Sequence, residues 1–112
     1  MGLRIEFLSK ERQIRVGEVS RFRFKITDST MEKPQNNLDV RTMASLVPGI
    51  WQKSEWARFV EDGVYEIALS VPHAGTYYVF LESPSMNVRY GQLPHMVLHA
   101  TSGRPDTEIG RP

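Results

Sequence analysis

The chain has 112 residues, of which 40% are apolar and 24% are charged, and these numbers fit one globular domain with a single core. Its 14 Lys and Arg nearly balance its 13 Asp and Glu, leaving a formal net charge of +1. Nucleic-acid-binding proteins displace counterions with a concentrated basic excess, so we expect no nucleic-acid partner. Because the chain lacks cysteine, it has no disulfides, thiolate nucleophiles or sulfur-rich metal sites.

The two ends of the chain carry few signals. The start, MGLRIEFLSK, has no basic region followed by an apolar run, which argues against a signal peptide. No stretch approaches the roughly 20 apolar residues that cross a bilayer, so we expect no membrane insertion. The end, TSGRPDTEIGRP, offers few apolar anchors. We therefore expect a folded domain over residues 1–101 and a mobile tail over residues 102–112.

Alternation of apolar and polar side chains with a period of two dominates the chain and predicts β-strands. Seven strands are expected, at residues 3–8, 19–28, 38–46, 54–60, 63–72, 76–83 and 94–100. The clearest is VSRFRFKITD, in which three apolar side chains face inward and three basic ones face outward: Phe22, Phe24 and Ile26, and Arg21, Arg23 and Lys25. Seven short strands in about 100 residues predict an all-β fold, an immunoglobulin-like antiparallel sandwich, with a small barrel as the alternative.

Two tyrosines each follow a turn that contains glycine. Asp62-Gly63 precedes Tyr65, and Ala74-Gly75 precedes Tyr77. We expect each ring to be buried while its hydroxyl bonds loop backbone at an end of the sandwich, as in the tyrosine corner of such folds.

These turns and strands carry a family resemblance. The order D-G-x-Y, an apolar strand, a Pro and G-x-Y resembles filamin-type immunoglobulin-like repeats. Over residues 3–100, VGEVSRFRFKITD, PGIW and EDGVYEIALSVPHAGTYYVFLESPS are similar to bacterial YtkA-like and FixH-like sandwich domains. That resemblance implies an exported, periplasmic setting, alone or beside β-propellers and cytochromes in redox proteins. It also implies copper handling in some relatives.

A copper site is therefore the alternative function to weigh. Its ligands would come from three histidines and two methionines: His73, His95, His99, Met86 and Met96. On a strand, His95 and His99 point the same way but lie about 13 Å apart, too far to share one ion. Because Met96 points away from His95, a site would need His73 or another loop methionine. We favour ordinary solvent-facing histidines, with no cofactor.

Catalytic motifs are not recognisable in this chain. Glu61 and Asp62 are adjacent carboxylates, but their place before a glycine is typical of a solvated turn. No serine is matched to a histidine in an identifiable nucleophile pattern. We therefore expect a protein that is not an enzyme.

Aromatic side chains at outward positions are the strongest functional signal. Tyr78 and Phe80 fall on the non-core face of a strand that should be central, and Trp51 and Trp56 lie near a corner. Exposed aromatic residues often mark partner surfaces. The leading hypothesis is a non-catalytic protein-interaction or structural module that uses these four residues. The resemblance implies that such a module can be an accessory domain of a larger exported redox protein. A carbohydrate-binding module is a third hypothesis. The basic row on residues 19–28 is interpreted as a solvent face.

Overall fold

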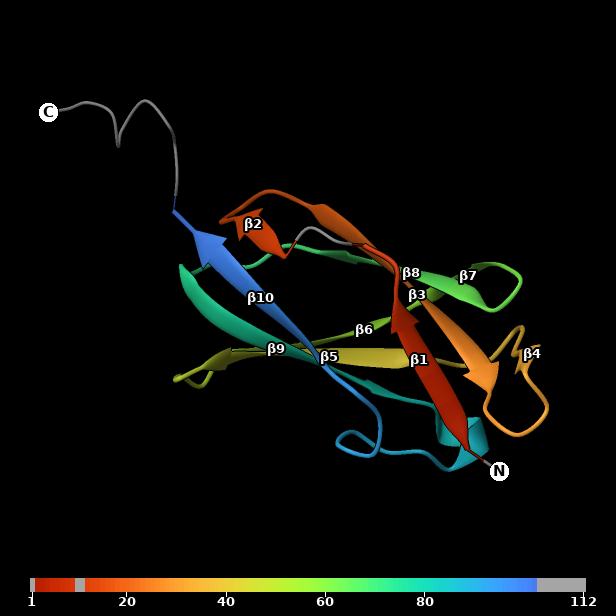
Figure 1. Cartoon of the computed structure of the whole chain (residues 1–112). Helices are drawn as coiled ribbons and strands as arrows, with labels where there is room; N and C mark the ends of the chain where they lie inside the picture. The colour runs from red at the N-terminus through yellow and green to blue at the C-terminus, as the bar shows by residue number, and fades with distance from the viewer. Residues whose placement is uncertain (1, 10–11, 103–112) are drawn as a thin grey trace, which may run out of the picture.

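The computed structural model describes residues 2–9 and 12–102. Two five-stranded sheets pack face to face (Figure 1). The first, here the β3 sheet, consists of β1 (Leu3–Phe7), β3 (Ser20–Asp28), β4 (Lys33–Pro34), β7 (Arg58–Glu61) and β8 (Val64–Leu69). The second, the β9 sheet, runs in the order β2 (Gln13–Arg15), β10 (Met96–Thr101), β9 (Gly75–Glu82), β5 (Arg41–Val47) and β6 (Gln52–Trp56). All named pairs are antiparallel except β2 with β10.

The predicted all-β sandwich is confirmed, but it has ten strands rather than seven. The expected strand over residues 54–60 is two strands in different sheets, because the chain crosses from β6 to β7 at Ala57. There the Ala57 N–H donates to the Val40 carbonyl at 2.8 Å. The two remaining additions, β2 and β4, are three and two residues long. Only Ile14 is buried among their residues, so they carry almost no alternation to read.

The core lies between the sheets and is filled from the positions that alternation indicates. On β3 the three inward apolar side chains are almost fully buried, while Arg21 and Arg23 are exposed. Three further strands or their ends supply the other large groups, namely Tyr65, Ile67, Leu69, Val71, Tyr77, Val79, Leu81, Met96 and Leu98. Burying such side chains stabilises the fold by about 1.5–3 kcal/mol each before the entropy cost.

The two tyrosines after glycine fasten loops to the core, as predicted. Both have 0% exposure. The Tyr65 hydroxyl donates to the Gln35 carbonyl at 2.7 Å and accepts from the Leu38 N–H at 2.9 Å. The Tyr77 hydroxyl donates to the His73 carbonyl at 2.7 Å and accepts from the His73 N–H at 3.2 Å. Burial raises the pKa of Tyr65, so it stays a neutral donor.

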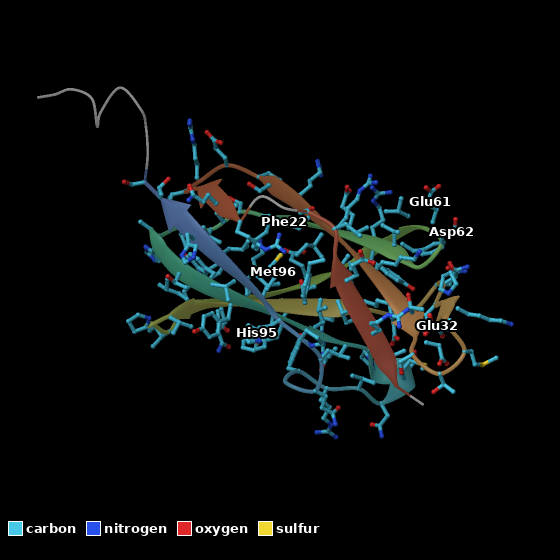
Figure 2. The ribbon with its side chains drawn as sticks, in the orientation of Figure 1. Phe22, Glu32, Glu61, Asp62, His95 and Met96 are labelled. Carbon is cyan, nitrogen blue, oxygen red and sulfur yellow. The ribbon has the colours of Figure 1, made fainter. Side chains whose placement is uncertain are left out.

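The turn between β7 and β8 requires its glycine. Asp62 and Gly63 both have positive φ, 45° and 77°, as a two-residue hairpin turn demands. A Cβ on Gly63 would lie 2.7 Å from the Ile26 carbonyl oxygen. Glu61 and Asp62 stand exposed at this hairpin tip (Figure 2), in agreement with a solvated turn.

The predicted mobile tail falls outside the described residues except for Ser102. Over the described part of the chain, no helix has the length and apolar character needed to span a membrane.

Candidate interaction surface

The outer face of the β9 sheet carries a continuous set of apolar and aromatic side chains. We call it the aromatic face and define it by Met43, Trp56, Tyr78, Phe80, His95 and Val97. Tyr78 lies opposite Val97 of β10, and Phe80 lies opposite Met43 of β5. Because β9 is the middle strand of its sheet, these rings stand at the centre of the face and not at an edge.

Three rings of this face pack against one another. The centroids of Tyr78 and His95 are 5.1 Å apart, with planes inclined at 28°. Phe80 lies 5.2 Å from His95 and 6.2 Å from Tyr78. Tyr78 and Phe80 are half-buried and His95 is exposed, so the three rings form a cluster outside the core. Their mutual contacts hold the three rings in place.

Trp56 extends the aromatic face across β5 to the edge strand β6. Its side chain is 57% exposed, and the Arg41 guanidinium lies 5.2 Å from the ring centroid. Arg41 also donates from Nε to Glu82 Oε2 at 2.7 Å and from Nη2 to the same oxygen. The Glu82 carboxylate is the main cause that raises the pKa of Arg41, and the Tyr90 hydroxyl adds to it. This end of the face is therefore charged but internally paired.

Trp51 does not share the aromatic face with the other predicted partner residues. It lies opposite Leu46 in the β5–β6 hairpin, whereas Trp56 lies opposite Arg41. The two tryptophans are five positions apart. Because side chains alternate between the two faces of a strand, this odd spacing places them on opposite sides of the sheet. The Trp51 ring meets buried Tyr77 edge to face at 5.6 Å. Its role is packing at the end of the core.

The predicted copper ligands are dispersed. Met96 is 3% exposed and lies between the sheets, while His95 lies outside them (Figure 2). His99 is exposed four residues further along, and its Nδ1 is 3.4 Å from Thr76 Oγ1. His73 and Met86 belong to a turn before β9 and to a 3₁₀ turn (Pro84–Met86) after it. Within residues 2–9 and 12–102, no three His, Asp or Glu side chains gather as metal ligands.

The outer face of the β3 sheet is charged. Glu66 accepts from Arg23 Nε at 3.0 Å and from Arg58 Nη2 at 2.7 Å. These hydrogen bonds, that from Arg58 first, lower the pKa of Glu66. With Arg21 exposed beside them, the arrangement agrees with a solvent face.

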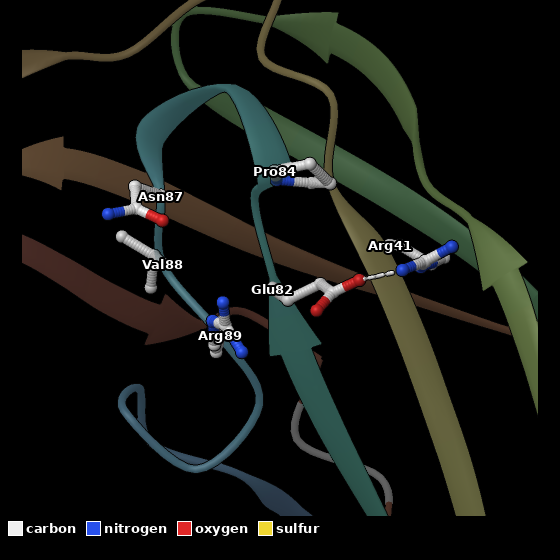
Figure 3. A pocket seen from close by; sticks show the side chains of 6 residues that line it. All are labelled: Arg41, Glu82, Pro84, Asn87, Val88 and Arg89. Atoms are coloured by element: carbon white, nitrogen blue, oxygen red, sulfur yellow. Dashed lines mark hydrogen bonds and ion pairs between the residues drawn. The ribbon is translucent and has the colours of Figure 1, made fainter.

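A small cavity lies at the charged end of the aromatic face (Figure 3). Its volume is about 240 Å³, and its lining residues are Arg41, Glu82, Pro84, Asn87, Val88 and Arg89. This cavity could not be predicted from the spacing of residues, because Arg41 and Arg89 are far apart in the chain and meet only through the fold.

Comparison with known proteins supports the fold and leaves the role open. No family model and no curated protein matches the chain. Among solved structures, it is similar to part of a candidate glycoside hydrolase from Bacteroides vulgatus, with 20% identity and a TM-score of 0.51 over 84% of this chain. The chain spans only 17% of that protein's length.

A second similar structure is the CARDB domain of the PF1109 protein from Pyrococcus furiosus, solved in complex with di-metal ions. It is 8% identical, with a TM-score of 0.48 over 89% of this chain and 88% of that domain. The YtkA-like, FixH-like and filamin-type families are not shown by these matches. What the chain shares with the similar solved structures is a small immunoglobulin-like β-sandwich fold.

Proposed function

We propose that this chain is a non-catalytic protein-interaction module that docks an apolar surface of a partner protein on its aromatic face. The observation that carries the proposal is the cluster of Tyr78, Phe80 and His95 on the outer side of a central strand. Half-buried rings still have apolar area to lose to a partner, and a sheet holds them rigidly, so little side-chain entropy is lost on docking.

The composition of the aromatic face supports a protein partner. Tyr, Trp, Phe, Met and Arg are the residues enriched in protein interfaces, and each occurs here or at its rim. The centre of the face, around Met43, Tyr78 and Val97, carries no Lys, Arg, Asp or Glu. A partner surface that is apolar at its centre would match it without burying an unpaired charge.

The ring geometry favours protein over sugar. A sugar ring stacks on a flat, open aromatic surface. The Tyr78 and Phe80 planes are inclined at 67° and form no common platform. One side of Trp56 is occupied by the Arg41 guanidinium. Irregular apolar side chains of a protein fit such a surface better than a sugar does.

The test uses short random peptides displayed on phage, selected on the folded chain, followed by affinity measurements on the enriched peptides. Tyr78→Ser with Phe80→Ser should weaken binding at least about 30-fold, because central aromatic residues of interfaces cost about 2 kcal/mol or more when truncated. Arg21→Ser with Lys25→Ser, the matched control on the β3 sheet, should leave affinity unchanged.

Thermal unfolding of both double variants accompanies the binding assay. Unchanged peptide affinity in the folded Tyr78→Ser, Phe80→Ser variant would remove the proposal. So would its outright unfolding, since the rings would then belong to the core. A response of tryptophan fluorescence to an oligosaccharide panel, without peptide enrichment, would replace the protein partner by a carbohydrate.

A further inference from the structure

We propose that the cavity beside the aromatic face binds a carboxylate group presented by the docked protein partner. This inference rests on the proposed function and specifies the chemistry of the partner. The partner would place an apolar side chain on Phe80 and Trp56, and an acidic side chain or chain terminus in the cavity.

The cavity is bounded by two guanidinium groups and one carboxylate. Figure 3 shows Glu82 between Arg41 and Arg89. The charged lining therefore has a net charge of +1, from two Arg and one Glu. Its volume of about 240 Å³ lies below the roughly 300–1,000 Å³ typical of pockets for drug-sized ligands. It suits one small charged group.

Arg89 has donors to spare. Among the described residues no acidic side chain pairs with its guanidinium, while its backbone N–H donates to Gln92 Oε1 at 2.6 Å and its carbonyl accepts from the Gln92 N–H at 3.1 Å. A guanidinium offers five N–H donors in a planar fork that matches a carboxylate. Arg41 directs Nε and Nη2 to Glu82, and its guanidinium also interacts with the Tyr90 hydroxyl, so Arg89 is the arginine with free donors. The cavity thus has more donors than its own carboxylate takes up.

The cavity and the aromatic face are continuous through Arg41 and β9. Arg41 stacks over Trp56 and at the same time lines the cavity. Phe80 and Glu82 are two residues apart on β9, so both point to the outer side of the sheet. A single partner segment can therefore contact the rings and the arginines together.

The first experiment isolates the cavity with a defined probe. We would titrate 3-phenylpropionate and the uncharged 3-phenylpropionamide into the chain and follow the Nε–H NMR signals of Arg41 and Arg89. The acid should shift both signals and bind about tenfold more tightly than the amide, since a charged acceptor makes a stronger hydrogen bond to a guanidinium than a neutral one does. Arg89→Gln should abolish that preference, whereas Lys25→Gln on the other sheet should keep it.

The second experiment identifies the source of the carboxylate. Peptides selected on the wild-type chain should carry Asp, Glu or a free carboxyl end next to an apolar residue, and Arg89→Gln should weaken them about tenfold. Equal binding of acid and amide, or no loss with Arg89→Gln in either assay, overturns the inference. Enriched apolar peptides without an acid overturn it while leaving the proposed function intact. Enrichment that survives Tyr78→Ser with Phe80→Ser defeats the proposed function itself.

Discussion

The outer faces of the two sheets differ although the same alternation builds both. On the β3 sheet the outward positions hold charges, and Arg23, Arg58 and Glu66 form a paired network. On the β9 sheet the corresponding positions hold Tyr78, Phe80 and their neighbours. A folded sandwich needs only its inner faces to be apolar. Alternation therefore reports which side chains are buried, while the chemistry of the outward positions shows that one outer face is charged and the other is apolar and aromatic.

The largest difference in stability is expected between neighbouring residues on β9 that face opposite ways. Val79→Ser leaves a cavity and an unsatisfied hydroxyl in the core, and should lower the free energy of unfolding by about 2–4 kcal/mol. Phe80→Ser, one residue along, should lower it by about 1 kcal/mol or less. Denaturant unfolding measures both; equal losses would show that the outer rings are structural.

A smaller effect is expected on the charged face, where stability depends on pH. The pKa of Glu66 is lowered from its usual 4.5 in the folded state, chiefly by the hydrogen bond from Arg58 and then by that from Arg23. Its contribution is therefore complete above pH 4.5 and is lost as pH falls through the lowered value. Glu66→Gln should lower Tm by about 2–4 °C at neutral pH, and this difference should close in acid. A difference that persists in strong acid, where Glu66 is protonated in the folded state too, would contradict the network's role.

The smallest expected effect comes from salt. Raising NaCl from about 0.1 M to about 1 M shortens the screening length from about 10 Å to about 3 Å. The Tm difference caused by Glu66→Gln should shrink by about half, because Arg23 and Arg58 are well exposed. The Tm difference caused by Phe80→Ser should not change. Salt dependence of the second difference would mean that charge, not ring packing, governs the aromatic face.

Much of the core could be predicted from the sequence. Phe22, Phe24 and Ile26 alternate with basic residues over one long strand, so their inward direction follows from the period alone. The anchoring of Tyr65 and Tyr77 could also be predicted from local sequence. Each tyrosine follows a turn that contains glycine, and that turn sets the point at which the ring enters the core. The outward direction of Tyr78 and Phe80 follows from the same alternation on β9.

The rest depends on how distant segments are aligned. His95 joins Tyr78 and Phe80 only because β10 pairs with β9 in one particular register. Residues 54–60 look like one strand in the sequence, but the chain passes from one sheet to the other at Ala57. Arg41 and Arg89 reach one cavity through β9 and the loop after it. None of these relations is expressed in the spacing of residues along the chain.

The parallel pairing of β2 with β10 has a mechanical consequence. The bonds between them include Val16 N–H to the Thr101 carbonyl and His99 N–H to the Arg12 carbonyl, both 2.9 Å. Both strands run in the same direction. A pull that draws β2 toward its N-terminal end and β10 toward its C-terminal end therefore acts along the axes of both strands. The bonds are then sheared together instead of being unzipped in succession. This short pair is placed to act as a clamp against stretching.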